Sequence, residues 1–310
     1  MPTPTAMDQG LRDTARAAFW QGFFSLPSMF DGIASVEPSS ADQETYAWLS
    51  YAAPVREFLS QRVKQGVPQV TYSIVNKLWE ATVAFNYLTR KFGKNNVVSK
   101  NVAQMGGKAR EHRDKLLTQV LVAGVSTKCY DTQYFFDIDH SETGGAIYTA
   151  SQDNDKTTDI VSAGLLPTDL EFAASMRTAQ SSLFSYKDGA GDPFWPGDAP
   201  TFVAMVPPAY RAVALQVSNN ESLTGPIAND LKGTFTVRTN PFITAVDQYF
   251  VFNTSHIQKA LILQMAEEVT LEDDMTGDNQ FNTKDVSFGS FACYNAGYGQ
   301  WRCALSHIFT

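Results

Sequence analysis

Cysteine is scarce in this sequence, and its three occurrences do not form a recognisable framework. They stand at positions 129, 293 and 303 of 310 residues, and no two of them make a Cys-x-x-Cys pair. Disulfide-rich secreted domains and zinc ribbons need paired, closely spaced cysteines. The sequence therefore argues against a disulfide scaffold and indicates a protein that is made and kept reduced inside a cell.

Long apolar runs are also missing. The first residues, MPTPTAMDQGLRDTAR, contain no apolar stretch behind a basic start, and nothing downstream approaches the ~20 apolar residues of a membrane span. We therefore expect a soluble protein with no secretory signal and no membrane contact. With 24 Lys and Arg against 32 Asp and Glu, the formal net charge of -8 argues against tight, non-specific binding to nucleic acid.

Signatures of nucleotide binding and of nucleophilic catalysis are absent as well. The sequence has no Gly-x-x-x-x-Gly-Lys-[Ser/Thr] loop, no strand followed by Gly-x-Gly-x-x-Gly, and no Gly-x-Ser-x-Gly elbow. Four histidines make a catalytic triad arithmetically possible, but none stands in a recognisable setting. They are His112, His140, His256 and His307.

Aromatic residues, by contrast, are plentiful at 12%, while only 18% of the residues are charged. Much of the surface must then be uncharged, which suits extensive contact with other protein surfaces. Residues 19–58 place nine aromatic residues between Gly and Pro without a sustained helical or strand period. We therefore expect this segment to be an arm that lies over its own fold or over a neighbouring subunit.

Apolar and polar residues alternate at 70–74 and again at 83–87. The pattern predicts two strands of a long antiparallel hairpin, turned near Asn76 and Lys77. Neither flank is strand-like, so the predicted hairpin stands alone. Because two strands alone are only marginally stable in water, we expect another copy of the chain to cover their apolar side.

After the predicted hairpin, the apolar residues follow a helical period. Apolar residues from Val102 to Ala123 recur at intervals of three, four and seven, which predicts an amphipathic helix of about 25 residues that ends near Gly124. The next stretch, CYDTQYFFDIDH at 129–140, alternates its aromatic and polar residues. This alternation predicts a strand directly after the helix.

The second half of the chain indicates a mixed α+β unit. A capping box from Thr168 to Glu171 opens a helix, and a strand at 202–206 runs into a helix that Pro207 and Pro208 begin. Three further strands are predicted at 234–243, 248–255 and 259–265, and a polar run follows at 272–285.

Metal binding is the sharpest chemical hypothesis for the stretch at 129–140. On a strand, Asp137 and Asp139 point the same way and His140 follows them, so two carboxylates and an imidazole could converge. However, alternating Asp is also what a half-buried strand presents to water, and no second cluster supplies further ligands. We therefore expect no metal ligand, no catalytic residue and no cofactor-binding residue in the chain.

The polar run at 272–285 has the composition of a calcium loop but not its register. Its glycine, Gly277, falls two positions early for the sharp turn, and no amphipathic helices flank the run. A solvated turn is the simpler interpretation. The oxygen-bearing residues that would serve as ligands are Asp274, Thr276, Asp278 and Asp285.

Six segments follow one another along the sequence: FFSLPSMFDGIASVEPSSADQETYAWLSYAAPVREF, YSIVNKLWEATVAFNYLTRK, HRDKLLTQVLVAG, CYDTQYFFDIDH, NPFITAVDQYFVFNT and GYGQWRCAL. In their order they resemble the major head subunit of Mu-like phages, a family of capsid proteins with the Hong Kong 97 fold. The resemblance spans most of the chain from about residue 18 and lies in the order of these segments, since none of them is chemically diagnostic alone.

The resemblance implies an α+β capsid fold with five segments. Residues 1–58 would be an N-terminal arm, 59–95 an extended β-hairpin called the E-loop, and 96–150 a peripheral domain with a long spine helix and the strand after it. Residues 151–265 would form an axial domain, and 266–310 the C-terminal part of the peripheral domain.

The resemblance also implies a function. The chain would be a major capsid protein, not an enzyme, that self-assembles through hexamers and pentamers into the icosahedral head shell of a tailed bacteriophage. It would need no cofactor, and its partners would be copies of itself, separate scaffold, protease and portal proteins, and packaged double-stranded DNA held without specific binding. The implied location is the virion, and the host cytoplasm during assembly. A separate scaffold is expected because the chain begins some twenty residues before the similar region.

Two alternative functions remain open. One is an encapsulin-like compartment shell with the same fold, which cargo enzyme instead of DNA inside purified particles would indicate. The other is a metal-dependent hydrolase that uses Asp137, Asp139 and His140. Replacement of all three residues by Ala would test this alternative, because a shell has no turnover to lose.

Overall fold

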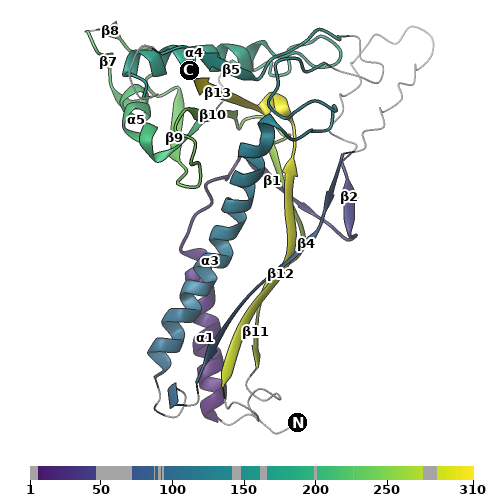
Figure 1. Cartoon of the computed structure of the whole chain (residues 1–310), viewed down its shortest axis with the longest axis vertical. Helices are drawn as coiled ribbons and strands as arrows, with labels where there is room; N and C mark the ends of the chain where they lie inside the picture. The colour runs from purple at the N-terminus through teal and green to yellow at the C-terminus, as the bar shows by residue number, and fades with distance from the viewer. Residues whose placement is uncertain are drawn as a thin grey trace, which may run out of the picture.

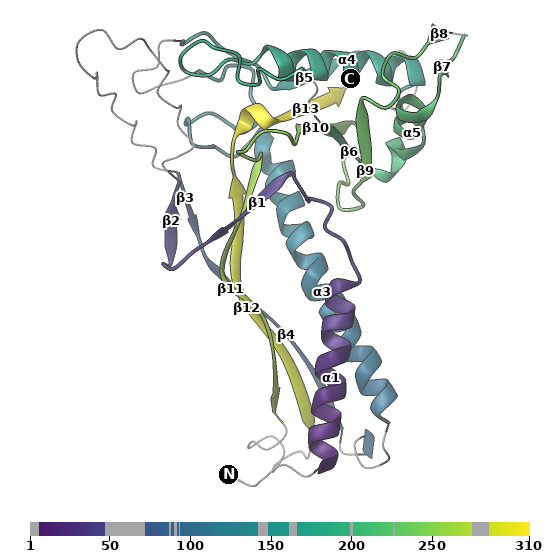
Figure 2. The same ribbon diagram turned by 180° about the vertical axis from the view of Figure 1, so that it is seen from behind.

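The computed structural model describes residues 6–46, 72–86, 88–89, 92, 94–141, 148–160, 166–198, 201–225, 227–274 and 285–310. Figures 1 and 2 show two parts joined end to end: a long stem of two helices beside a narrow sheet, and a head that contains a second sheet and further helices. The predicted α+β class is confirmed. None of the described helices is long and apolar enough to span a bilayer.

Helices α1 (Ala6–Phe24) and α3 (Asn95–Val122) lie side by side along the stem. Their backbones approach closely at two glycines, Gly22 and Gly106. A Cβ added to either glycine would overlap a main-chain carbonyl oxygen of the opposite helix. Glycines that weaken an isolated helix by ~1 kcal/mol each therefore allow this pair to pack tightly.

The long helix predicted between Val102 and Ala123 is confirmed by α3, whereas the irregular arm predicted from residue 19 is wrong at its start. Residues 19–24 complete α1, whose buried face includes Leu11, Ala15, Phe19 and Phe23 at intervals of four. This period becomes visible only when the polar residues before Phe19 are read together with the aromatic ones. Residues 47–58 of the predicted arm lie outside the described residues.

The stem sheet has four strands in the order β1-β11-β12-β4. β11 and β12 form a long antiparallel pair, β1 runs parallel to β11, and β4 runs antiparallel to β12. Their bounds are β1 Ala34–Pro38, β4 Lys77–Phe85, β11 Leu261–Asp274 and β12 Val286–Tyr298. The stem sheet is therefore built from segments that are far apart in the sequence.

The hairpin predicted to turn at Asn76 and Lys77 is wrong in its pairing. β4 continues the predicted alternation but pairs with β12, and the strand before it, β3 (Ser73–Val75), pairs with β2 (Gln43–Thr45). Alternation predicts that a segment is a strand but does not name its neighbour, because any strand with one buried face has the same period. Residues 59–71, 87, 90–91 and 93 of the predicted E-loop lie outside the described residues.

The head contains a five-stranded sheet in the order β5-β13-β10-β6-β9, which α4 (Asp169–Ser185) and α5 (Arg211–Asn219) contact. The strands predicted at 202–206, 234–243 and 248–255 are confirmed by β6, β9 and β10. The strand bounds are β5 Asp155–Thr158, β6 Phe202–Val206, β9 Phe235–Thr239, β10 Gln248–Asn253 and β13 Ala304–Phe309. The remaining short elements are β7 Ser222–Leu223, β8 Ile227–Ala228, η2 Ala123–Val125, η4 Pro208–Tyr210 and η5 Trp301–Cys303.

Helix α4 begins with the predicted capping box. The Thr168 hydroxyl accepts the main-chain N–H of Glu171, and the Glu171 carboxylate accepts the main-chain N–H of Thr168 at 2.8 Å. These reciprocal bonds satisfy donors that the first turn of a helix leaves open. The prediction of a helix start at this position is confirmed.

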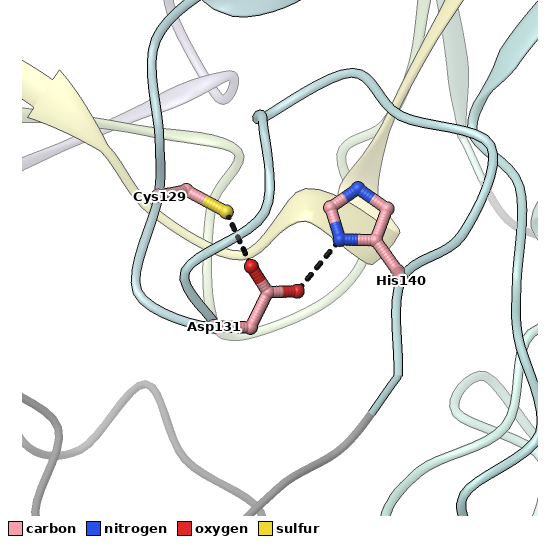
Figure 3. A group of neighbouring side chains, drawn as sticks. All are labelled: Cys129, Asp131 and His140. Carbon is pink, nitrogen blue, oxygen red and sulfur yellow. Dashed lines mark hydrogen bonds and ion pairs between the residues drawn. The ribbon is translucent and has the colours of Figure 1, made fainter.

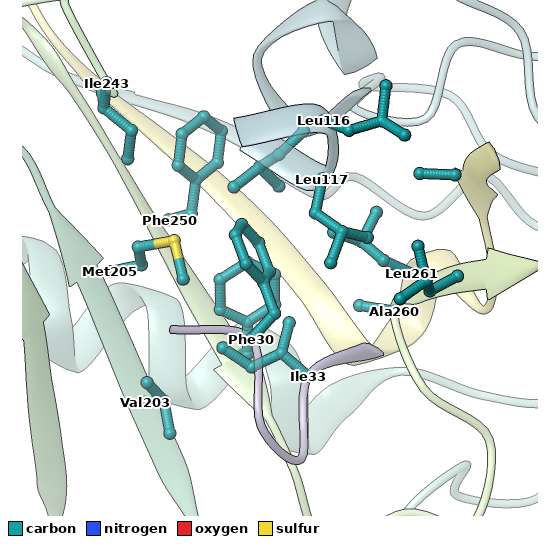
Figure 4. Close-up of a cluster of buried hydrophobic side chains, with 14 of the residues drawn as sticks. Phe30, Ile33, Leu116, Leu117, Val203, Met205, Ile243, Phe250, Ala260 and Leu261 are labelled. Atoms are coloured by element: carbon teal, nitrogen blue, oxygen red, sulfur yellow. The ribbon is translucent and has the colours of Figure 1, made fainter. Parts of the chain in front are cut away.

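Stem and head share one apolar core where they join (Figure 4). It collects side chains from α3, from the segment before β1, and from strands of both sheets. Burying each large apolar side chain stabilises the fold by roughly 1.5–3 kcal/mol, so the joint is held mainly by this packing. The labelled residues are Phe30, Ile33, Leu116, Leu117, Val203, Met205, Ile243, Phe250, Ala260 and Leu261.

The two sheets divide the chain differently from the segments that the resemblance implies. The C-terminal segment 266–310 contributes β12 to the stem, but its last strand, β13, lies inside the head sheet between β5 and β10. Similarly, β1 from the segment 1–58 lies in the stem sheet. The predicted domain boundaries follow chain order, whereas the sheets bring distant parts of the chain together.

Candidate functional site

The stretch CYDTQYFFDIDH, predicted as a strand, is a loop of turns that follows α3 and η2. Thr132 has a φ of 73°, in the left-handed region, and the chain turns there. Phe135 and Phe136 are both buried although they are neighbours, so the loop lacks the two alternating faces of a strand. The prediction of a strand at this position is therefore wrong.

The loop does not bring Asp137, Asp139 and His140 together as ligands. The Asp137 carboxylate accepts two main-chain N–H groups of its own loop, at 3.2 and 2.8 Å, and Asp139 accepts the Gln133 side-chain amide at 3.0 Å. Desolvation and the neighbouring Asp137 raise the pKa of Asp139. Asp139 is exposed while His140 is fully buried, so the metal-dependent hydrolase alternative loses its ligand set.

His140 instead joins Cys129 and Asp131 in a buried cluster (Figure 3). In the described part of the chain, this is the one group of three His, Cys, Asp or Glu side chains whose ligand atoms all lie within 4.8 Å of one another. Nδ1 of His140 lies 2.6 Å from Oδ2 of Asp131, and the Cys129 thiol donates to Oδ1 of Asp131 at 3.1 Å. None of the three residues is more than 7% exposed.

A second layer of residues fixes this cluster. The His140 ring lies flat on Trp301, with centroids 4.0 Å and planes 9° apart, and its Nε2 lies 3.2 Å from Oδ1 of Asn154. Asp131 also accepts the main-chain N–H of Gln133 at 3.1 Å. Burial raises the pKa of the Asp131 carboxyl, but hydrogen bonding to His140 and its charge outweigh burial and lower the pKa overall.

The cluster is not arranged for nucleophilic catalysis. Burial and the adjacent Asp131 raise the pKa of the Cys129 thiol, so the thiol stays protonated at neutral pH. The nucleophile would also have to be reached by a substrate, and the side chains are buried. The arrangement can tie the loop together or hold a metal ion, both of which are structural roles.

Sequence reasoning missed Cys129 and Asp131 as partners of His140. A strand would have placed both of them on the same face as Asp137 and Asp139, which led to the wrong trio. The turn at Thr132 gives no sequence signal, because Gly and Asn are the residues that usually mark a positive φ.

The stem also has a sheet edge that no described residue of the chain pairs with. β4 is an edge strand among the described residues. One of its faces is exposed along its whole length, while Trp79, Val83 and Phe85 on the other face are partly or fully buried. Leu78 at its start is 68% exposed. A nine-residue edge strand with an exposed Leu is a template for pairing with another chain.

Apolar side chains are exposed at the opposite edge as well. Val36 on β1 is 62% exposed and Ile257 is 90% exposed. A groove of about 330 Å³ lies beside β1, lined by Ser35, Glu37, Ile257, Gln258 and Lys259. Both edges of the stem sheet therefore offer surface suited to contact with other protein chains.

Comparison with known proteins identifies relatives of the chain. The Mu-like prophage FluMu major head subunit of Haemophilus influenzae is 36% identical over 122 residues, which are 39% of this chain and 40% of that protein. The major capsid protein of Escherichia phage Mu is 30% identical over 155 residues, 48% of this chain and 50% of that protein. The matched region thus spans half or less of these relatives.

The fold has relatives among solved structures. A chain from the procapsid of bacteriophage JBD30 superposes with a TM-score of 0.60 at 20% identity, over 99% of this chain and 76% of that chain. The Hong Kong 97-like capsid fold that the resemblance implies is confirmed by this likeness. The family described as the Mu-like prophage major head subunit gpT matches residues 9–164, half of the sequence, and the chain belongs to this family.

Proposed function

We propose that the chain is the major capsid protein of a tailed phage. It acts as a structural subunit, not as an enzyme, and assembles with copies of itself into the icosahedral head shell that encloses double-stranded DNA. The observation that carries the proposal is the stem, whose sheet is exposed at β4 and at β1 in a chain of the major head subunit family.

A shell subunit binds its neighbours through many weak contacts that symmetry repeats. The two exposed edges of the stem suit this role because they lie on opposite sides of one sheet, so one subunit can contact two neighbours at once. The continuous pairing of β1, β11, β12 and β4 keeps these two edges in fixed relation. We infer that hexamers and pentamers form through such contacts and close into a shell.

The charge of the chain is compatible with a container for DNA. A net charge of -8 provides little attraction to phosphate, so the genome is held inside without specific binding to the wall. We further propose that separate scaffold, protease and portal proteins act with this chain, that assembly takes place in the host cytoplasm, and that the finished shell is part of the virion.

Electron microscopy of the purified, concentrated protein tests the proposal. We expect closed shells, or rings of five and six subunits where scaffold is needed for closure. A protein that stays monomeric at high concentration, with and without the scaffold supplied by co-expression, would contradict the proposal. Particles that contain a cargo enzyme instead of DNA would favour the encapsulin-like alternative.

A further inference from the structure

We propose that Cys129, Asp131 and His140 bind one divalent transition-metal ion of the zinc class, which holds together the loop at 129–140. This site is distinct from the surfaces invoked for assembly and does not depend on them. It also differs from the ligand set Asp137, Asp139 and His140 that the sequence pattern suggested.

The orientation of the Asn154 amide fixes which ring nitrogen of His140 carries hydrogen. Nδ2 of Asn154 faces three main-chain carbonyl oxygens at 2.9, 3.3 and 3.4 Å, while its Oδ1 accepts a main-chain N–H at 2.9 Å. The atom that faces His140 is therefore an acceptor. Because Nε2 of His140 lies 3.2 Å from this oxygen, Nε2 is protonated.

Nδ1 of a neutral His140 then directs a lone pair at Asp131. The carboxylate oxygen of Asp131, 2.6 Å away, is itself an acceptor. Two acceptors in such contact need a positive ion between them, which is either a proton held by the ring or the carboxyl, or a metal ion. The burial of both residues makes an unsatisfied contact costly.

Cys129 gives the pair of His140 and Asp131 a third ligand. Its sulfur converges on the same carboxylate, 3.1 Å from the other oxygen, and the ligand atoms of the three residues all lie within 4.8 Å of one another. Thiolate, imidazole and carboxylate together are ligands that Zn²⁺ and related ions prefer. With a neutral imidazole, one thiolate and one carboxylate balance the two charges of the ion, which suits a buried site.

The residues around the cluster resemble the outer shell of a metal site. A histidine that binds a metal through one nitrogen commonly donates its other N–H to a carbonyl oxygen, and His140 donates Nε2–H to Asn154. The stacking of the ring on Trp301 further directs Nδ1 into the cluster. The main-chain oxygen of Tyr134, 4.0 Å from the Cys129 sulfur, is a candidate for the fourth ligand.

Metal binding requires a small opening of the cluster and the loss of a proton. Zinc bonds of about 2.0–2.3 Å place neighbouring ligand atoms roughly 3–4 Å apart, so the Asp131 carboxylate must move away from His140 by less than about 1 Å. The Cys129 thiol gives up its proton to solvent as the sulfur–metal bond forms, so binding releases at least one proton per ion. The ion would then tie together the loop that follows α3 and η2, and this loop packs on Trp301 of η5 through the His140 ring.

The test uses the full-length chain after treatment with a chelator, with Co²⁺ and Zn²⁺ as probes. We expect one Zn²⁺ per chain by equilibrium dialysis and a thiolate-to-cobalt charge-transfer absorption with Co²⁺. Cys129→Ser should abolish this absorption, and Asn154→Leu should weaken Zn²⁺ binding about 10–100-fold. Cys293→Ser on β12 is the matched control and should change neither.

Two results on the unsubstituted chain keep the test decisive even if a variant fails to fold. Proton release on addition of Zn²⁺, followed in weakly buffered solution, should reach at least one proton per bound ion. No bound Zn²⁺ and no proton release, with nuclear magnetic resonance showing both His140 nitrogens protonated, would mean that a shared proton fills the role and would overturn the metal site.

Discussion

His307 on β13 is a buried histidine whose pKa is strongly lowered in the folded protein. Its ring packs beside Tyr249 and Phe309, Nε2 bonds to Thr158 at 2.8 Å, and Nδ1 has no partner among the described residues. Burial, with a smaller influence from Lys156, lowers the pKa of His307 to about 4. The ring is therefore neutral in the folded protein at neutral pH.

This pKa predicts a loss of stability in mild acid. Between an unfolded-state pKa of about 6.5 and the folded value, the unfolded chain binds a proton that the folded chain does not, so the free energy of unfolding falls as the pH falls. The contribution of His307 reaches roughly 3 kcal/mol at pH 4. Urea unfolding at pH 7 and pH 4 should show a smaller difference for His307→Gln than for the unsubstituted chain. An equal pH dependence in both proteins would contradict this assignment.

Thr132 is a second residue that carries an energetic cost. Its φ of 73° places a β-branched side chain in the left-handed region, which costs roughly 1–2 kcal/mol. We expect Thr132→Gly to raise the free energy of unfolding by about 1 kcal/mol, because Gly adopts this φ without the cost. Thr132→Ala is the control and should gain less, since it keeps a Cβ. Urea unfolding of the three proteins measures the difference.

At the scale of the elements, the contact between α1 and α3 depends on two glycines. Gly22→Ala and Gly106→Ala would each push a Cβ into a carbonyl of the opposite helix, and we expect each to lower the free energy of unfolding by about 1–3 kcal/mol. Gly10→Ala on α1 is the matched control, because a Cβ there meets nothing within 4 Å. It should instead stabilise the chain by up to ~1 kcal/mol through helix propensity. Thermal unfolding distinguishes these outcomes.

The elements that the sequence predicts well are those whose signals are local. The apolar period of α3 lies within one continuous segment, and the capping box of α4 and the proline start before α5 each lie within a few residues. All three elements are present. Strand partners could not be predicted in the same way. β4 shows alternation, but its pairing with β12 joins segments about two hundred residues apart, and no local pattern encodes that choice.

The cluster at Cys129, Asp131 and His140 was hidden for a related reason. Its members lie within twelve residues of the sequence, but a turn at Thr132 and the burial of His140 against Trp301 decide which of them meet. Trp301 comes from the far end of the chain. The residue types pointed to metal chemistry, whereas the correct partners depend on tertiary structure.

At the scale of the whole molecule, assembly should depend on the exposed edge of the stem. Leu78→Glu places a charge on the β4 edge, and we expect it to reduce the yield of shells at least tenfold, while subunit stability changes by no more than about 0.5 kcal/mol. Gln104→Glu on the exposed face of α3 is the control with the same added charge. Sedimentation and electron microscopy give the assembled fraction. Normal shell yield from Leu78→Glu would show that this edge is not a subunit contact.

The division of the stem sheet between distant segments has a consequence for synthesis. α1 and α3 leave the ribosome long before β11 and β12, so the nascent chain carries the apolar face of its helix pair without the sheet that later covers it. Pairings between such distant segments form slowly, and exposed strands favour aggregation in the meantime. Chaperones of the host should therefore influence the yield of this protein at the stage of the single chain, before any contact with a neighbouring subunit.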